Sequence, residues 1–471
     1  MIQSTLADAA KSMRGSLRGK DAQFRGVSTD TRSLRPGELF VALQGPNFDG
    51  ATFVEQAADS QAAGAVVSRE MNVNFSTIVV DDTVKALGAL GKNWRKQLSA
   101  TVLGVTGSNG KTTVKEMIGS LLDHQNTVAT KDNENNEFGI AYTVLKIDKD
   151  TENLILECGA RKAGDFDLIV KYLWFDALVI TNLNNSHIGI FGSEEIIKKT
   201  KLKLLEGLKT KGLLIEGAFK NLSKSLRKQD PTKDVINIYY VNEESDLSLK
   251  YSWLFNIEIN ESDLDSYYIS MINKDAESES ERLNYSLNLG IKHNCSNAVI
   301  SIALMKEWGS PEQIIQKLDG FVSPQKNRFY CSKLGDHILI NDTYNANPTS
   351  MLSAINELKT NPNYPDSQII IIGDMYELGK SSELEHVNIL NELMTLDKLK
   401  LLILVGDRFK VSYKANTRAI ESNYIFHLDR NATLPKEVFK NTLINSSVIL
   451  VKGSRGMKME RYLDYLRNNI I

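Results

Sequence analysis

A glycine-rich segment constrains this chain more than any other feature of its sequence. Residues 104–113 read Gly-Val-Thr-Gly-Ser-Asn-Gly-Lys-Thr-Thr. The apolar run 101–105 before the glycines predicts a buried strand, and the run 114–122 after them predicts a helix. A strand, a glycine-rich turn and Gly-Lys-Thr at the start of a helix form the pattern of a phosphate-binding loop. We therefore predict an α/β domain that binds a nucleotide at this loop.

The residues of the loop suit a triphosphate chemically. Gly107 and Gly110 allow the backbone to curl so that several N–H groups face one anion, and the helix N-terminus adds partial positive charge. Lys111 can reach the terminal phosphates, and the Thr112 hydroxyl can hold Mg²⁺. Val105 stands where the usual pattern has a glycine, and the alternative interpretation is a glycine turn with an exposed lysine. The loop residues that we predict to bind ATP are Gly107, Ser108, Asn109, Gly110, Lys111, Thr112 and Thr113.

Composition narrows the class of protein. With 471 residues the chain can form about three domains, and its hydrophobic fraction of 42% and net charge of -2 are typical of a soluble globular protein. It lacks the basic excess of a nucleic-acid-binding protein and any run near the roughly 18 apolar residues of a membrane span. The first residues do not form a signal peptide, and the three cysteines have no metal-ligand spacing. We expect a cytoplasmic monomer.

Alternating strand and helix patterns divide the chain into three α/β segments, 1–97, 98–320 and 321–471. In the first segment, residues 28–32 read Ser-Thr-Asp-Thr-Arg, a cluster of hydroxyl, carboxylate and guanidinium groups that suits a sugar or a diphosphate. The turn 44–50 carries an aromatic residue that could stack on a base. For both loops, an ordinary capped turn is the alternative.

Polar residues follow two predicted strands of the central segment. The strand 153–157 ends in Glu157, and the strand 177–181 leads into a loop that ends at His187. Because ligands of open α/β sheets lie beyond the carboxyl ends of the strands, these two side chains are placed where a phosphate-bound metal would lie. The alternatives are a solvated strand end for Glu157 and an ordinary loop histidine for His187.

Four further stretches of the central segment are less specific. The polar loop 131–139 can contact substrate or simply cap a helix, and the lysines of the predicted helix 193–207 indicate a solvated basic face. Residues 242–290 predict a hairpin insertion with an acidic turn. Asn294 and Asn297 lie one helical turn apart, on the same face of a helix.

In the third segment, predicted strands lead into long polar motifs. The strand 337–342 leads into Thr-Tyr-Asn-Ala-Asn-Pro-Thr, 368–372 into Gly-Asp-Met-Tyr-Glu-Leu-Gly, and 447–451 into Lys-Gly-Ser-Arg-Gly-Met-Lys-Met-Glu. Because these strands end in polar residues, we expect a binding surface along one edge of the sheet. Pro348 suits the first turn of the following helix, and Arg328 lies at the junction with the central segment.

Taken together, these motifs resemble the Mur ligase family over nearly the whole chain. The shared motifs are TDTR, TGSNGKTTVKEM, NNEFG, LECGA, the loop that ends at His187, HNxxNA, NDTYNANPTSM, GDMYELG and KGSRGMKME. The last three are the most specific, and they are most similar to the family members that add D-alanyl-D-alanine. The resemblance implies an α/β protein of three domains, with a central P-loop parallel-sheet ATPase domain and a Rossmann-like C-terminal domain.

The resemblance also implies an activity. A member of this family would use ATP to join D-alanyl-D-alanine to UDP-N-acetylmuramoyl-tripeptide through an acyl phosphate, in the synthesis of peptidoglycan precursors. Residues 1–97 would bind the UDP-sugar, 98–320 ATP, and 321–471 the incoming dipeptide. Two alternatives remain: another amino-acid-adding ligase of the superfamily, such as a diaminopimelate-, lysine- or folate-directed enzyme, and a nucleotide-binding regulator without catalysis.

Site residues follow from the resemblance position by position. Lys111, Glu157, His187 and Lys201 would be catalytic, with Mg²⁺ held by Thr112, Glu157 and His187 and with Lys201 at the position of a carbamylated lysine. The expected adenosine and phosphate contacts are Asn294, Asn297, Arg328 and Asn345. The expected substrate contacts are Ser28, Thr29, Asp30 and Arg32 for the uridine diphosphate, and Asp342, Lys452 and Arg455 where the third domain closes over the reaction centre.

Two departures from the family pattern stand near these residues. The histidine loop continues with Ile188 and Gly189 where a leucine and an acidic residue are usual. In the first segment, Ala51 follows Asp-Gly where a histidine is usual. The first departure removes any role of that acid, and the second puts one contact to the nucleotide of the UDP-sugar in doubt.

Overall fold

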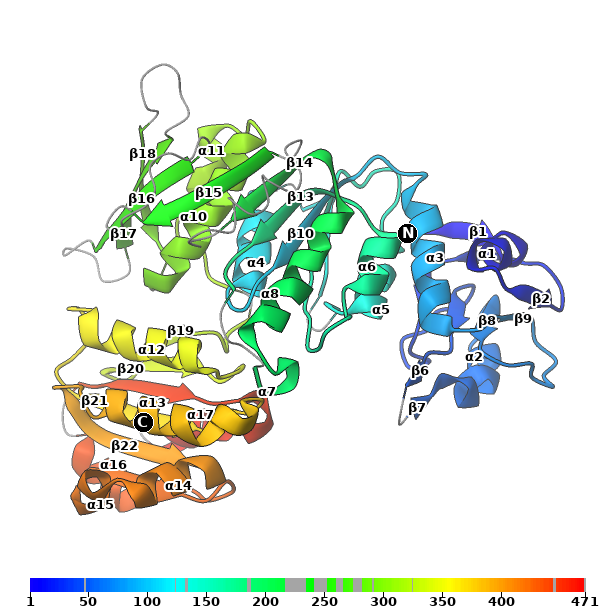
Figure 1. Ribbon diagram of the computed structural model, residues 1–471. Helices are drawn as coiled ribbons and strands as arrows, with labels where there is room; N and C mark the ends of the chain where they lie inside the picture. Colours follow the sequence, from blue (N-terminus) through cyan, green and yellow to red (C-terminus); the bar gives the residue numbers. More distant parts are fainter. Residues whose placement is uncertain are drawn as a thin grey trace.

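Three sheets follow one another along the chain in the computed structural model of this protein (Figure 1). Its described residues are 1–45, 48–122, 124–131, 134–183, 188–216, 234–240, 252–259, 266–273, 282–289, 292–323, 325–443 and 446–469. The predicted metal ligand His187 and the acidic turn near 280 lie outside the described residues.

The first sheet has the strand order β2-β9-β8-β5-β4, and β2 alone runs antiparallel to its neighbour. Its strands are β2 (Ser16–Arg18), β4 (Val27–Ser28), β5 (Leu39–Val41), β8 (Gly64–Val67) and β9 (Thr77–Val79). Two small ribbons accompany it, formed by β1 (Gln3–Thr5) with β3 (Gln23–Arg25) and by β6 (Gln44–Gly45) with β7 (Phe48–Asp49). Its helices are α1 (Leu6–Met13), α2 (Val54–Asp59) and α3 (Thr83–Arg95).

The second sheet has nine strands in the order β11-β12-β10-β13-β14-β15-β16-β17-β18, parallel from β11 to β16 and antiparallel beyond. The strands are β10 (Thr101–Thr106), β11 (Thr127–Ala129), β12 (Asn153–Glu157), β13 (Phe175–Ile180), β14 (Leu208–Glu216), β15 (Asp234–Tyr240), β16 (Ser252–Ile259), β17 (Ser266–Asn273) and β18 (Arg282–Asn288). The helices are α4 (Lys111–Leu121), α5 (Glu137–Val144), α6 (Asp167–Tyr172), α7 (Ile188–Phe191), α8 (Glu194–Leu202), α10 (Lys292–Glu307) and α11 (Glu312–Ile315).

Connectivity of the second sheet creates a crevice at the end of β10. The chain passes from β10 through β11 to β12 on one side, and then crosses to β13 on the other side. Loops that leave neighbouring strands in opposite directions open a crevice at the carboxyl ends of those strands. The glycine-rich loop follows β10 and therefore lies at this point of the fold.

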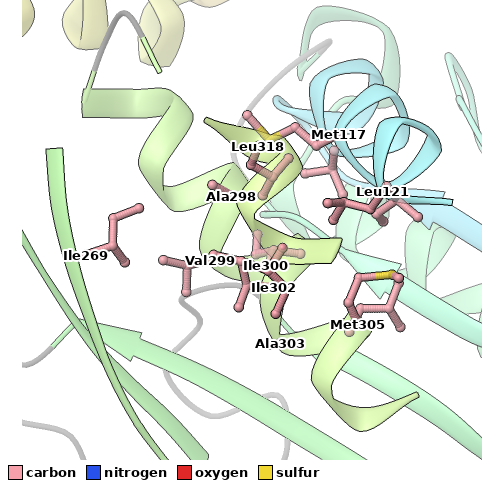
Figure 2. Packing of buried hydrophobic residues seen from close by; sticks show 14 of the residues in the cluster. Met117, Leu121, Ile269, Ala298, Val299, Ile300, Ile302, Ala303, Met305 and Leu318 are labelled. Atoms are coloured by element: carbon pink, nitrogen blue, oxygen red, sulfur yellow. The ribbon is translucent and has the colours of Figure 1, made fainter. Parts of the chain in front are cut away.

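The antiparallel end of the second sheet confirms the predicted hairpin strands but makes them part of the domain core rather than an insertion. Trp253, Tyr267 and Tyr285 on β16, β17 and β18 are each at most 2% exposed. Figure 2 shows this core, where Ile269 of β17 faces the apolar side chains of α10, and α10 in turn packs against Met117 of α4. Because alternate residues of these strands are buried under α10, the strands extend the sheet rather than projecting from it.

The third sheet has the order β19-β20-β24-β21-β22-β23, with all neighbours parallel except β19 and β20. Its strands are β19 (Tyr330–Leu334), β20 (His337–Asp342), β21 (Gln368–Gly373), β22 (Leu399–Val405), β23 (Ile425–Leu428) and β24 (Val448–Lys452). Its helices are α12 (Pro348–Thr360), α13 (Ser382–Leu393), α14 (Asp407–Ala415), α15 (Thr417–Glu421), α16 (Lys436–Thr442) and α17 (Glu460–Asn469).

The predicted α/β class and most of the predicted elements are confirmed. Strands β12 and β20 have the predicted bounds, and Pro348 occupies the first turn of α12. The predicted helix 193–207 is shorter, because α8 ends at Leu202 and a 3-10 turn (Lys203–Gly207) follows. Within the described residues, none of the helices combines the length and the apolar character that crossing a membrane demands.

Candidate active site

A cavity of about 500 Å³ lies where the carboxyl ends of the second and third sheets face each other. Its wall comes from both domains, so that neither domain contains the site alone. The wall contains thirteen of the predicted site residues: Ser108, Asn109, Gly110, Lys111, Thr112, Thr113, Glu157, Lys201, Asn294, Arg328, Asp342, Asn345 and Lys452.

Two glycines of the phosphate-binding loop are required by its backbone path. Gly107 has φ of 147° and Gly110 has φ of 79°, conformations that residues with a side chain rarely adopt. A Cβ on Gly107 would lie 2.0 Å from Thr181 Oγ1, and one on Gly110 would lie 2.5 Å from Asn297 Oδ1. Asn297 is therefore buried beside the loop and is not part of the cavity wall.

Two lysine amines meet at one carbonyl of the loop. Lys111 Nζ donates to Gly107 O at 2.8 Å and to Ser108 O at 3.0 Å, and Lys201 Nζ donates to Gly107 O at 2.7 Å. Lys111 is half-buried, so the alternative of a glycine turn with an exposed lysine is wrong.

Burial lowers the pKa of both amines. It lowers the pKa of Lys111 to about 8, Glu157 partly offsets the shift, and Arg328 adds to it. Burial also lowers the pKa of Lys201 well below its ordinary value, with the charge of Lys111 as a second cause. Lys201 is 2% exposed whereas its neighbours Lys198 and Lys199 are exposed. The prediction of a solvated basic face therefore holds for those neighbours and is wrong for Lys201.

Glu157 is a buried carboxylate, and the alternative of a solvated strand end is wrong. The residue is 3% exposed, its Oε1 accepts from Asn135 Nδ2 at 3.2 Å, and its Oε2 lies 3.6 Å from Lys115 Nζ. Lys115 was not among the predicted site residues, and its only signal in the sequence was its place one helical turn after Lys111. Asn135 belongs to the polar loop 131–139 and lines the cavity. The loop also caps α5 through Asn136, which confirms the helix-capping role.

The C-terminal domain forms the opposite wall. Asp342 and Lys452 are register partners on the neighbouring strands β20 and β24, and Lys452 Nζ donates to Asp342 Oδ2 at 2.6 Å and to Asn345 O at 3.1 Å. The Arg328 guanidinium lies 3.6 Å from the centre of the Tyr344 ring. A ligand in the cavity can therefore contact the buried Asp342–Lys452 ion pair and the Arg328 guanidinium, which is stacked on Tyr344.

The remaining predicted residues lie elsewhere. Arg455 is exposed and pairs with Glu460 outside the cavity wall. In the first domain, Arg32 pairs with Asp30 at 2.6 Å, and hydrogen bonds from Arg32 lower the pKa of Asp30 to about 2. Ser28 Oγ donates to Asp30 O at 3.0 Å within the same turn, with Thr29 between them. None of the residues of the turn 28–32 belongs to this cavity wall.

Gly189, which departs from the family pattern, makes a contact between domains. Its N–H donates to Glu377 O at 3.0 Å, and a Cβ on it would lie 2.1 Å from the backbone nitrogen of Gly379. Two glycines at this point allow the backbones of α7 and of the GDMYELG motif to touch. Gly189 thus allows a direct backbone contact between the central and the C-terminal domain.

The cavity offers oxygen ligands for a divalent cation. No group of three or more His, Cys, Asp and Glu residues gathers at metal-binding distance among the residues that the structure describes. Mg²⁺ usually takes one or two protein oxygens together with phosphate and water oxygens. The Thr112 hydroxyl and the buried Glu157 carboxylate lie in one cavity wall and fit that requirement.

Comparisons with known proteins agree with this geometry. Models of the Mur ligase family match residues 23–97 (catalytic domain), 105–305 (middle domain) and 327–455 (glutamate ligase domain). The UDP-N-acetylmuramoyl-tripeptide–D-alanyl-D-alanine ligase of Bacillus subtilis (strain 168) is 33% identical over 98% of this chain and 97% of its own length. The chain belongs to the Mur ligase family. The ligase of the same name from Escherichia coli (strain K12) is 30% identical to this Mur ligase over 100% of the chain and 99% of its own length.

Solved structures of MurF ligases have the same fold as this Mur ligase. A crystal structure of MurF from Acinetobacter baumannii superposes with a TM-score of 0.86 at 27% identity and covers 99% of each chain. A MurF ligase from Thermotoga maritima in complex with ADP superposes with a TM-score of 0.77 at 25% identity and covers 95% of this chain and 98% of that one.

The lowered pKa of Lys111 predicts how nucleotide affinity depends on pH. A bound triphosphate favours the charged amine and raises its pKa above the free value of about 8. The affinity for ATP should therefore be constant below pH 8 and fall by up to about tenfold per pH unit above it. Isothermal titration calorimetry between pH 6 and pH 10 (roughly the range that brackets the shift) measures this change. Lys111→Arg keeps its charge throughout that range, and an equal decline in this variant would contradict the assignment.

Proposed function

We propose that this Mur ligase uses ATP to join D-alanyl-D-alanine to UDP-N-acetylmuramoyl-tripeptide. The observation that carries the proposal is the shared cavity wall, in which the loop lysine Lys111, the carboxylate of Glu157 and the Asp342–Lys452 pair face one another. The names of the relatives that cover the full chain support the choice of substrates. The binding of ADP by a structural neighbour supports the choice of nucleotide.

The first chemical step joins two anions. A carboxylate oxygen of the tripeptide attacks the γ-phosphorus of ATP, the new O–P bond forms, and the bond from the γ-phosphorus to the ADP oxygen breaks. Repulsion between carboxylate and phosphate is the main obstacle, so neutralisation of phosphate charge dominates catalysis. Lys111 and the N–H groups of the loop supply this neutralisation. Mg²⁺ held by Thr112, Glu157 and His187 would supply further positive charge at the phosphate oxygens.

The second step transfers the acyl group. The amine of D-alanyl-D-alanine attacks the acyl carbon, the C–N bond forms, and the C–O bond to phosphate breaks as the nitrogen loses a proton. The C-terminal domain (321–471) presents Asp342 and Lys452 at the edge of the cavity, where the dipeptide would have to enter. Asn294, Arg328 and Asn345 would contact the adenosine and phosphate groups, and Asn297 would support the loop beside them. Arg455 would approach only on further closure of the domain.

The first domain (1–97) would hold the uridine diphosphate. Ser28, Thr29, Asp30 and Arg32 supply hydroxyl groups and a guanidinium within one turn, and Arg32 is exposed. Its guanidinium would exchange Asp30 for a phosphate group, since bidentate contacts suit either anion.

Lys201 would serve as a carbamate. A neutral amine attacks carbon dioxide, the N–C bond forms, and a proton leaves to give a carbamate anion. Burial lowers the pKa of Lys201 well below its ordinary value, which favours the neutral form that this reaction requires. The carbamate would face Lys111 across the Gly107 carbonyl and would orient that amine toward the phosphates.

Acceptor dependence tests the proposed reaction. Purified protein with Mg²⁺, ATP and the UDP-tripeptide should release phosphate only when D-alanyl-D-alanine is added, because the acyl phosphate needs an amine acceptor. A coupled phosphate assay measures the release. Equal turnover with free diaminopimelate, lysine or glutamate and none with the dipeptide would favour another ligase of the superfamily. ATP binding without ADP release under any acceptor would favour a regulator.

Removal of the loop lysine tests its place in the reaction. Lys111→Ala should lower phosphate release by at least about a hundredfold, since it removes the charge that faces the developing phosphate. The melting temperature should change little, because a half-buried amine with a lowered pKa adds little to stability. Calorimetric unfolding checks this control, and an unfolded variant would show a structural role instead.

Removal of the buried lysine tests the carbamate. Lys201→Ala should lose activity, and added short carboxylates such as acetate should partly restore it by replacing the carbamate anion. The exposed neighbour provides a matched control, since Lys198→Ala should keep its activity. Full activity of Lys201→Ala without any added carboxylate would remove the carbamate from the proposal.

A further inference from the structure

One side chain of the C-terminal domain touches the phosphate-binding loop directly. Asn347 Nδ2 donates to Asn109 Oδ1 at 3.0 Å, although the two residues are 238 positions apart in the sequence. Both residues line the cavity. The family resemblance implies a role for Asn345 but none for Asn347, two residues later.

The position of the Asn347 amide is fixed by its own helix. Asn347 is the N-cap of α12, and its Oδ1 accepts from Ser350 N at 2.9 Å. Ser350 Oγ in turn accepts from Asn347 N at 3.1 Å and completes a capping box. Because the cap uses the oxygen of a planar amide, the NH₂ group is left to point away from the helix, toward Asn109.

The backbone of Asn109 is fixed by residues of the central domain. Its N–H donates to Asn182 Oδ1 at 2.8 Å, and its carbonyl accepts from Asn182 Nδ2 at 3.1 Å and from Thr181 Oγ1 at 2.5 Å. These bonds tie the backbone of the loop to the end of β13 in the central domain. The side chain of Asn109 remains as the part that the C-terminal domain contacts.

We propose that Asn347 is a positioning residue that couples docking of the C-terminal domain to nucleotide binding, by holding Asn109 of the phosphate-binding loop. The inference rests on the proposed function only in taking the cavity as the nucleotide site. The bond exists only when both walls of the cavity are in place, and the residues expected to contact the nucleotide, such as Lys111 and Arg328, lie on both walls. Docking and nucleotide binding therefore favour each other, as linkage requires.

A double-mutant cycle on nucleotide affinity tests the proposal. Asn347→Ser keeps a good N-cap but removes the amide that reaches Asn109, and Asn109→Ala removes its acceptor. Each change should weaken binding of the Mg²⁺ complex of a non-hydrolysable ATP analogue by about three- to tenfold, the usual range for one hydrogen bond. The double variant should bind no more weakly than the weaker single variant. Asn347→Thr, which also caps the helix, should reproduce the loss.

The structure offers a matched control at another helix. Asn416 is the N-cap of α15, where its Oδ1 accepts from Ala419 N at 3.1 Å, outside the cavity wall. Asn416→Ser should leave analogue affinity unchanged, and both Asn→Ser variants should melt at similar temperatures. Calorimetry without tripeptide or dipeptide keeps this test separate from the acceptor assay.

Two results would overturn the coupling. If the affinity of the double variant falls by the product of the two single-variant losses, Asn347 acts on the nucleotide or on the fold independently of Asn109. If Asn347→Ser binds the analogue as tightly as the unaltered protein does, the contact has no influence on nucleotide binding.

Discussion

The site depends on a single backbone carbonyl shared by two lysines. Gly107 O accepts from both Lys111 and Lys201, and two full charges cannot remain that close in a buried setting without a large cost. The conflict is eased because burial lowers the pKa of Lys201 well below its ordinary value, whereas the pKa of Lys111 falls only to about 8. The neutral form is thereby favoured at Lys201, and the Lys111 amine can carry the charge that attracts an anion.

The sheet topology explains why these amines meet anionic substrates rather than solvent. Strands β10, β12 and β13 end at one edge, which gathers the loop, Glu157 and Asn182. Strands β20 and β24 end at the facing edge with Asp342 and Lys452. Neither edge by itself encloses a substrate, so enclosure and the resulting low dielectric arise only where the two domains meet.

Much of this arrangement could be predicted from the sequence. A strand, glycines and Gly-Lys-Thr specify a loop with little freedom, because Gly107 and Gly110 have no room for a Cβ. Strand ends such as Glu157 and Asp342 are predictable because topology alone brings them to one edge. Burial was harder to predict: Lys201 and Lys198 look alike in the sequence, and only the packing of α8 makes one buried and the other exposed. The core position of β16 to β18 was missed because their apolar face becomes visible only beside α10.

A cavity with one wall on each domain also has a pharmacological consequence. A compound that contacts only the central domain's wall gains no contacts when the domains dock. It therefore binds the separated and the docked arrangements with equal affinity. A compound that spans Lys111 and Lys452 binds the docked arrangement alone and shifts the population toward it. Inhibitors that reach both walls would therefore stabilise the docked arrangement of the two domains.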